Sequence, residues 1–425
     1  MESDNKSTDL LQLRQSHHNM IILQINTSVN TGSTGRITEQ IGRKAIQNGH
    51  ISSIAYGVSG SEDSRSKLIK VGSRPEMMLH GLKTRMFDLH GFGSKNATLA
   101  LIDKIKIIKP DVIGLHNLHG YYLNIEVLFN FLKESQKSVV WTFHDCWPFT
   151  GHCTYFDSVG CKKWINGCYD CPKTRFYPAS YGLDNSKWNY EKKKELFNGL
   201  ENLRIVTPSQ WLAGLVKKSF LKKYPVDVIH NGVDIDIFTP QAKELPSGFE
   251  QDERKIVLGV ASVWDKRKGL EDFKKLRQIL DKSFRIVLVG LNNEQLSDLP
   301  SGITGIARTE NVHQLAALYG LAEVFVNPTW QDNFPTTNIE SLACGTPVIT
   351  YDTGGSPESI NRQTGKKVDQ GDITGIKNAI VEIAEKGKSF YKDKCREQAI
   401  SHYDKNDRFQ DYVNLYEELV TIQIK

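Results

Sequence analysis

Residues 332–358 of this 425-residue chain, DNFPTTNIESLACGTPVITYDTGGSPE, decide its fold. Two carboxylates, Asp332 and Glu340, stand eight positions apart, and the turn between them leads into a predicted helix. The breaker at 344–347 ends that helix, and the apolar run 348–351 predicts a buried strand. A helix that begins after a turn directs free N–H groups and its positive dipole end outward, so the turn suits an anion. Because carboxylates there can also accept hydrogen bonds from sugar and ribose hydroxyls, the segment predicts a sugar-nucleotide site.

The same segment resembles the carboxylate pattern of the retaining nucleotide-sugar glycosyltransferases of family 4 (glycosyltransferase group 1). Asp332, Phe334 and Glu340 match the acidic-x-Phe-x5-Glu pattern, and residues 343–348 and 354–358 match the two motifs that follow it. The chain departs from the family at Asp332, where a glutamate is usual, so its carboxylate reaches less far. The resemblance implies the GT-B fold, which has two Rossmann-like, doubly wound α/β domains facing a central cleft.

Length and composition suit two globular domains without a membrane span. The chain is 39% hydrophobic and 24% charged, and its net charge is +5. No stretch approaches the roughly 20 apolar residues that a membrane helix needs. The first residues are polar and mixed in charge, unlike a signal peptide. We therefore expect a cytoplasmic protein, in peripheral contact with the cytoplasmic face of the inner membrane.

Alternating apolar runs and helical patterns predict two parallel α/β domains. We expect a polar leader at 1–19, a first, acceptor-side domain at 20–238 and a linker at 239–253. A second, nucleotide-sugar-binding domain is expected at 254–403. The resemblance implies that a C-terminal helix at 404–425 crosses back to the first domain, whereas the pattern alone fits a helix on the second domain equally well.

The donor site is expected to combine a glycine-rich turn with two cations. Gly35 lies in the turn 31–36 before the first helix, where glycine lets the backbone approach a pyrophosphate closely. In the second domain Lys268 matches the family's lysine, and Val263 stands at the usual arginine position, so we expect Arg267 to supply the second cation. The leaving diphosphate gains negative charge, which such cations stabilise. The resemblance places Glu340 on the ribose and assigns the sugar to Asp332, Asn333, Phe334, Pro335, Thr336 and Thr337.

Two predicted strand ends of the first domain carry histidines. His144 and Asp145 follow one strand, and His116, Asn117 and His119 follow another. Ligands of open α/β sheets bind beyond the carboxyl ends of strands, so these side chains are expected to face the cleft. The resemblance puts His144 beside the transferred sugar, with Asp145 and Asp332 completing the expected catalytic group. We expect His116, Asn117 and His119 on the acceptor side.

A cysteine-rich loop at 146–178 is the unusual feature of the first domain. It contains Cys153, Cys161, Cys168 and Cys171 within nineteen residues, a clustering that predicts a structural zinc site, with free thiols as the alternative. The run HDCWPFTGHC that opens it resembles a branch of family 4 that builds colanic-acid-type exopolysaccharide, capsule or O-antigen. The family resemblance implies that catalysis requires no cofactor.

The expected reaction moves a sugar from a UDP- or GDP-sugar to a lipid-linked glycan with retention of configuration, which makes the protein a hexosyltransferase-type enzyme. Apolar and basic residues interleave at 77–109 and suit an anionic membrane surface, although an ordinary surface helix has the same pattern. One alternative is a sugar-nucleotide epimerase of the same fold. Another is a zinc-stabilised nucleic-acid-binding protein, which leaves residues 332–358 unexplained; we therefore expect no nucleic-acid partner.

Overall fold

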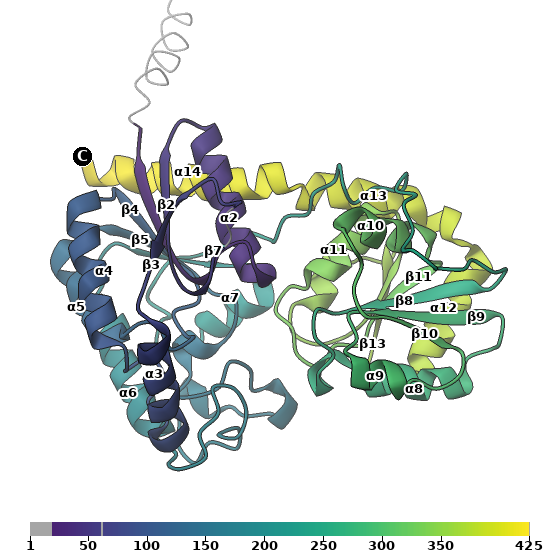
Figure 1. Cartoon of the computed structure of the whole chain (residues 1–425), viewed down its shortest axis with the longest axis horizontal. Coiled ribbons are helices and arrows are strands. Elements are labelled where there is room, and N and C mark those ends of the chain that lie inside the picture. Colours follow the sequence, from purple (N-terminus) through teal and green to yellow (C-terminus); the bar gives the residue numbers. More distant parts are fainter. Residues whose placement is uncertain (1–18, 61–62, 425) are drawn as a thin grey trace, which may run out of the picture.

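The computed structural model describes residues 19–60 and 63–424, so nearly all of the predicted leader lies outside the described residues. Figure 1 shows two α/β domains side by side, each built on a parallel sheet with helices on both faces. This arrangement confirms the predicted pair of Rossmann-like domains. It follows from the sequence because buried parallel strands are short, continuous apolar runs, and amphipathic helices connect them.

The first domain has a seven-stranded parallel sheet in the order β3-β2-β1-β4-β5-β6-β7. The crossover from β3 to β4 places two groups of helices on opposite faces. Its strands are β1 (Ile21–Ser28), β2 (Ile51–Ser59), β3 (Lys67–Lys70), β4 (Val112–Leu115), β5 (Ser138–Thr142), β6 (Leu203–Thr207) and β7 (Val226–Val228). Its helices are α2 (Gly32–Gln47), α3 (Arg74–Phe87), α4 (Lys95–Ile108), α5 (Ile125–Ser135), α6 (Ser186–Phe197) and α7 (Gln210–Val216).

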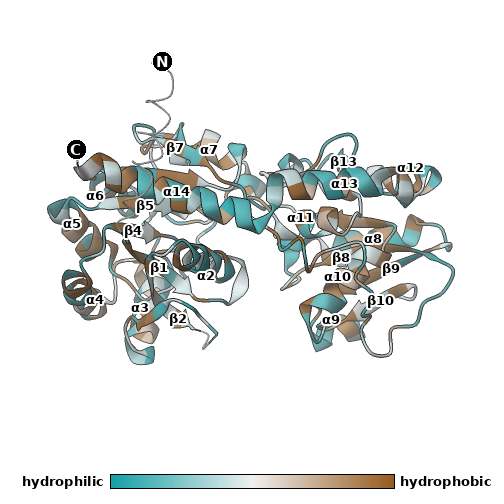
Figure 2. Ribbon diagram, turned by 90° about the horizontal axis from the view of Figure 1, so that it is seen from above, coloured by the Kyte–Doolittle hydropathy of each residue, from teal (hydrophilic) through white to brown (hydrophobic). Residues whose placement is uncertain are grey.

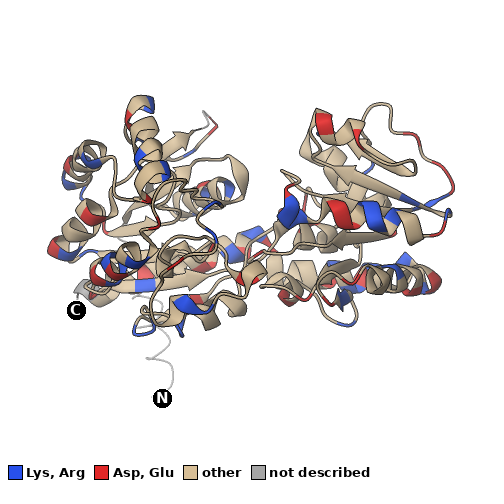
Figure 3. Cartoon of the chain, turned by 90° about the horizontal axis from the view of Figure 1, so that it is seen from below, with Lys and Arg blue, Asp and Glu red and all other residues tan. Residues whose placement is uncertain are grey.

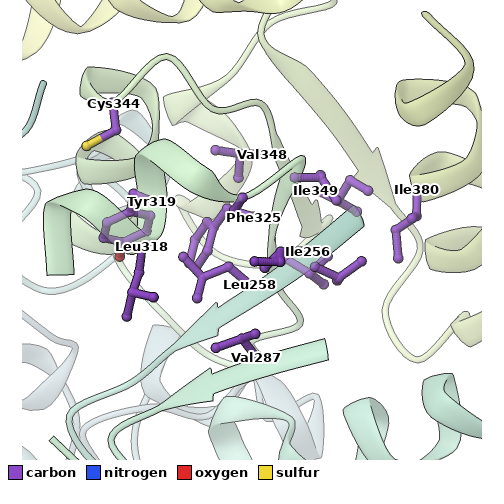
Figure 4. Close-up of a cluster of buried hydrophobic side chains, with 14 of the residues drawn as sticks. Ile256, Leu258, Val287, Leu318, Tyr319, Phe325, Cys344, Val348, Ile349 and Ile380 are labelled. Carbon is purple, nitrogen blue, oxygen red and sulfur yellow. The ribbon is translucent and has the colours of Figure 1, made fainter. Parts of the chain in front are cut away.

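The second domain repeats the design with six strands in the order β10-β9-β8-β11-β12-β13. Its core joins strand residues such as Val287 and Phe325 to helix residues such as Leu318 and Ile380 (Figure 4). The strands are β8 (Lys255–Val260), β9 (Phe284–Val289), β10 (Ile303–Ile306), β11 (Val324–Asn327), β12 (Val348–Tyr351) and β13 (Gly365–Val368). The helices are α8 (Leu270–Ile279), α9 (Asn293–Ser297), α10 (Val312–Leu321), α11 (Thr336–Ala343), α12 (Ile373–Lys386) and α13 (Lys388–Tyr403).

The last helix, α14 (Lys405–Ile424), returns to the first domain. It follows α13 directly and extends over the first sheet (Figures 1 and 2). Val413 and Tyr416 are fully buried in a cluster that contains Ile22 of β1 and Val112 of β4. The crossing helix thus covers apolar residues of the first sheet, as the family resemblance implies. No helix in the described part of the chain has the length and apolar character to span a membrane.

Candidate active site

The acidic turn after β11 lies where the carboxyl ends of the two sheets meet. The side chain of Asn333 joins the domains: its Nδ2 donates to the His144 carbonyl at 3.3 Å, and its Oδ1 accepts from Ser209 Oγ at 2.5 Å. Gly354 backs the turn so closely that a Cβ there would lie 1.9 Å from the Asp332 carbonyl oxygen. Its φ of +56° also favours glycine. The Gly-Gly motif therefore holds the acidic turn against the first domain.

Three charged residues of the second domain meet at this turn. Asp332 Oδ2 lies 2.5 Å from Lys268 Nζ, and Arg267 Nη1 donates to the Gln331 carbonyl at 2.9 Å. Burial by itself would raise the pKa of Asp332, but Lys268 and Arg267 outweigh it and keep the pKa below its ordinary value. Asp332 is therefore ionised at neutral pH. The two predicted cations and the first predicted carboxylate do form one group.

Glu340 lies one turn along α11, where the charge of a residue of the first domain acts on it. Its Oε2 accepts from the Tyr319 hydroxyl at 3.1 Å. Burial raises the pKa of Glu340, while Tyr319, the positive charge of Arg36 and the Thr336 hydroxyl oppose that rise. Arg36 thus brings a cation from the first domain toward the carboxylate. Arg36 is the last residue of the predicted glycine-rich turn, and the sequence assigned it no function. An exposed arginine after a glycine has no sequence pattern that marks it as a binding residue.

Gly35 lies in the first turn of α2, which begins at Gly32 and so includes most of the predicted glycine-rich turn. A Cβ on Gly35 would lie 2.8 Å from Ser28 Oγ and 3.3 Å from the Asn30 nitrogen. Glycine therefore lets α2 start close to the end of β1. This packing brings the neighbouring Arg36 to the domain junction.

His144 is held by a chain of side-chain hydrogen bonds. Its Nε2 lies 3.1 Å from His116 Nδ1, and His116 Nε2 lies 3.1 Å from Gln24 Oε1. Gln24 Nε2 donates to the Thr38 carbonyl, so Oε1 is the end that accepts from His116. His116 then accepts from His144 Nε2–H, which leaves Nδ1 of His144 as an acceptor. His116 is only 2% exposed and is hydrogen-bonded to His144, so its predicted place on the acceptor side stays a prediction.

Asp145 orients the other histidine of the predicted acceptor side. Its Oδ2 lies 2.8 Å from His119 Nε2, and its Oδ1 accepts from the Trp147 nitrogen at 2.9 Å. His119 Nδ1 lies 3.1 Å from the Tyr177 hydroxyl. Both carboxylate oxygens are thus engaged by the protein, which suits a residue that positions His119. Asn117 is half-buried beside them, and its backbone nitrogen donates to Asn26.

Some predicted donor-site residues turn inward. Phe334 is buried and stacks on His230, with ring centroids 4.7 Å apart, and its carbonyl accepts from Asn231 Nδ2. Pro335 is also buried, whereas Thr336 and Thr337 are half-buried at the start of α11. Asn333 and Phe334 therefore connect the domains through their side chains. Their contacts with the first domain hold the turn in place, a role that only the tertiary structure shows.

The four loop cysteines surround a small cavity but are not arranged as metal ligands. Cys153 donates a hydrogen bond to the sulfur of Cys171, which lowers the pKa of Cys171 to about 7. Cys168 Sγ accepts from the Gly151 nitrogen, and Cys161 also lines the cavity. Within residues 19–60 and 63–424, no three His, Cys, Asp or Glu side chains lie where they could hold one metal ion. The structure thus leaves the zinc site a prediction.

Two Rossmann-like domains that face each other are the architecture of the GT-B glycosyltransferases. A family model described as Glycosyltransferase Family 4 matches residues 35–237, and one described as Glycosyl transferases group 1 matches residues 254–386. The chain belongs to these glycosyltransferases.

One relative matches nearly the whole chain, and another matches about half of it. Over 414 residues it is 25% identical to WcaC of Escherichia coli K12, a glycosyl transferase assigned to colanic acid biosynthesis, and the match covers 94% of this chain and 100% of WcaC. It is 28% identical over 227 residues to an N-acetylgalactosaminyltransferase of Campylobacter jejuni that acts on N,N'-diacetylbacillosaminyl-diphospho-undecaprenol, covering 47% of this chain and 56% of that one.

Solved structures share the fold at lower identity. A sucrose-phosphate synthase of Thermosynechococcus elongatus superposes with a TM-score of 0.69 at 17% identity, covering 95% of this chain and 100% of that one. Anabaena HepE, in complex with UDP and glucose, superposes with a TM-score of 0.65 at 14% identity, covering 94% and 100%. These similarities confirm the GT-B fold.

The environment of His144 predicts a loss of stability in mild acid. Burial lowers the pKa of His144 to about 4, whereas an unfolded histidine binds its proton near pH 6.5. Between these values only the unfolded chain takes up the proton, so the free energy of unfolding falls as pH is lowered from about 6.5 to about 4. His144 should contribute about 1–2 kcal/mol to the difference between pH 7 and pH 5. Denaturant unfolding at both pH values measures it. The His144→Gln variant should show a smaller difference; an equal difference would contradict this assignment.

Proposed function

We propose that this protein is a retaining glycosyltransferase that moves a sugar from a nucleoside-diphosphate sugar, with UDP or GDP as carrier, to a lipid-linked glycan. One observation supports this most strongly. Asp332 and the cations Lys268 and Arg267 meet at the turn 332–337, and Glu340 follows this turn on α11. Asn333 of the same turn donates to the backbone carbonyl of His144 in the first domain. A metal-independent transferase needs cations for the departing diphosphate and polar groups that bind sugar hydroxyls, and this junction supplies both.

The donor would lie along the start of α11. Arg267 and Lys268 would bind the diphosphate, Glu340 would accept from the ribose hydroxyls, and Asp332 would accept from hydroxyls of the sugar. The N–H groups that open α11 add positive potential, because no side chain caps this helix. Arg36 would approach the nucleotide from the first domain, since its charge already acts on Glu340.

The proposed chemistry occurs on one face of the sugar. The acceptor hydroxyl oxygen forms a bond to the anomeric carbon as the bond from that carbon to the diphosphate oxygen breaks. The hydroxyl proton passes to the departing diphosphate oxygen, so no covalent enzyme intermediate is needed. His144, neutral at pH 7, can accept a hydrogen bond from a sugar or acceptor hydroxyl through Nδ1. NMR of the product would show an anomeric configuration equal to that of the donor.

The relatives support a role in bacterial surface polysaccharide synthesis: capsule, O-antigen or exopolysaccharide. WcaC is assigned to colanic acid biosynthesis, and the name of the Campylobacter enzyme specifies an undecaprenyl-diphosphate-linked acceptor. An epimerase of the same fold would convert the nucleotide-sugar donor without any acceptor. Turnover of the donor in the absence of acceptor would therefore distinguish an epimerase from the proposed transferase. Figure 3 shows basic and acidic residues interspersed over both domains, whereas a nucleic-acid-binding protein would have a basic face.

Donor binding can be measured by thermal shift against UDP-, GDP- and ADP-sugars without added metal. One nucleotide series should raise the melting temperature, because a ligand that binds only the folded state stabilises it. Glu340→Ala should abolish the shift, since it removes the proposed ribose contact. Glu385→Ala, an exposed carboxylate on α12, is the matched control and should keep the shift. An unchanged shift in Glu340→Ala would contradict the assigned donor site.

An exposed apolar surface supports contact with a membrane. It joins α3 to the end of the cysteine-rich loop, because the nitrogens of Tyr181 and Leu183 donate to the carbonyls of Arg85 and Met86. Met78 alone is 74% exposed, a large value for an apolar side chain. This apolar surface comprises Met78, Leu79, Leu82, Met86, Phe87, Phe176, Tyr177, Tyr181 and Leu183, with the exposed cations Arg74, Lys83, Arg85 and Arg175 among them. We infer that it rests on anionic lipid at the cytoplasmic face of the inner membrane.

Vesicle sedimentation tests this inference. The protein should bind phosphatidylglycerol vesicles more strongly than phosphatidylcholine vesicles, and salt should weaken the binding. The double variant Met78→Ser/Leu82→Ser should bind several-fold less. Ile107→Ser, which removes an equally exposed apolar residue on α4, should bind like the wild type. Equal losses in both variants would argue against a membrane role for the apolar surface.

The predicted structural zinc has its own test. A zinc ion would require the four cysteine thiolates to converge at about 2.3 Å from one point. Elemental analysis of protein purified without chelators should find one zinc per chain, and Cys161→Ser should lose it. Protein with less than a tenth of an equivalent would contradict the prediction.

A further inference from the structure

Two arms of the cysteine-rich loop reach from the first domain to the cations of the donor site. Tyr155 follows Cys153 by two positions, and Lys173 follows Cys171 by two. The hydrogen bond between Cys153 and Cys171 joins the two arms at their base. The donor-site assignment above used neither Tyr155 nor Lys173, and both contact residues of the second domain.

The first arm places an aromatic ring against Arg267. The guanidinium carbon of Arg267 lies 5.6 Å from the centre of the Tyr155 ring, within the range of a cation–π contact. The Tyr155 hydroxyl donates to the His144 carbonyl at 3.4 Å, the same oxygen that accepts from Asn333. Tyr155 therefore stands between the two halves of the site and limits where the guanidinium can lie.

The second arm contacts Gln331, whose backbone carbonyl accepts a hydrogen bond from Arg267. Lys173 is only 5% exposed, and its Nζ donates to Ser158 Oγ at 3.1 Å and to Gln331 Oε1 at 3.4 Å. Gln331 is equally buried, and its backbone carbonyl accepts from Arg267 Nη1. Among the described residues, Gln331 Nε2 has no hydrogen-bond partner, so the Lys173 contact is what orients this amide.

Arg267 is thus constrained from three sides. The Tyr155 ring makes a cation–π contact with its guanidinium, the Gln331 carbonyl accepts from Nη1, and Asp265 Oδ2 lies 3.7 Å from Nε. A flexible arginine loses considerable side-chain entropy when it binds a phosphate. Constraints that hold it in place before the donor arrives reduce that loss.

We propose that Tyr155 and Lys173 are positioning residues that fix Arg267 for the donor diphosphate, so that the cysteine-rich loop completes the donor site from the first domain. This inference rests on the proposed function, since it takes Arg267 as a diphosphate ligand. It gives a role in donor binding to a loop of the first domain, the domain that the sequence assigned to the acceptor side.

Calorimetric titration with UDP, GDP, UMP and GMP tests the proposal in the full-length protein. The readout is the affinity gained from the second phosphate, which is the ratio of the monophosphate Kd to the diphosphate Kd. Tyr155→Leu and Lys173→Met should each lower this ratio about threefold to tenfold. Neither should lower it further when combined with Arg267→Met, because both act through that guanidinium. Tyr155→Phe and Lys173→Arg should keep most of the ratio.

Matched controls come from the same loop. Tyr169→Leu and Lys162→Met alter an exposed tyrosine and an exposed lysine and should leave the ratio unchanged. If Tyr155→Leu does not fold, the combination of Lys173→Met with Arg267→Met still tests whether the loop acts through Arg267. Equal weakening of mono- and diphosphate binding, or full effects in the Arg267→Met background, would overturn the proposal. If the wild type binds nucleotide and Glu340→Ala abolishes it, such results reject only this inference; if the wild type binds no nucleotide, the proposed function fails as well.

Discussion

The polar contact between the acidic turn and the first domain is the constraint on which the site depends. The Asn333 amide bridges the His144 carbonyl and the Ser209 hydroxyl, while the Glu358 carboxylate accepts from the backbone nitrogens of Gln210 and Trp211. These bonds set the carboxyl ends of the two sheets against each other. With the domains apart, Asn333 would lose its bonds to the His144 carbonyl and the Ser209 hydroxyl.

The electrostatics of the junction suit the departure of an anion. Lys268 and Arg267 keep Asp332 ionised, and Asp265 lies beside Arg267 as a second carboxylate. His144, in contrast, is neutral, because protonation would cost desolvation energy that the structure does not return. A neutral imidazole can accept from a hydroxyl, which a protonated one cannot. The two cations proposed to bind the diphosphate therefore belong to the second domain, and the neutral imidazole belongs to the first.

The cysteine-rich loop is anchored in the core of the first domain by aromatic side chains. Short 3-10 helices at Trp147–Phe149, Asp157–Val159 and Lys163–Ile165 interrupt it. Phe149, Phe156 and Trp164 belong to the apolar core of the first domain. Aromatic anchoring explains how an irregular segment can hold Tyr155 and Lys173 in place without regular secondary structure. The same segment continues to the apolar surface, so it connects the donor site with the proposed membrane contact.

Local patterns in the sequence determined much of the secondary structure and of the acidic turn. The central strands, the acidic turn before α11 and its Gly-Gly backing are readable because burial, helix starts and turns depend on residues close together in the chain. The edge strands β3, β7, β10 and β13 escaped prediction because three or four residues with one exposed edge have no distinct period. Only the tertiary structure decided that Arg36 faces Glu340, that Gln24 and His116 hold His144, and that Tyr155 and Lys173 meet Arg267 and Gln331. Most of these contacts join residues that are far apart in the chain, and the path of the chain through two domains, not local composition, brings such residues together.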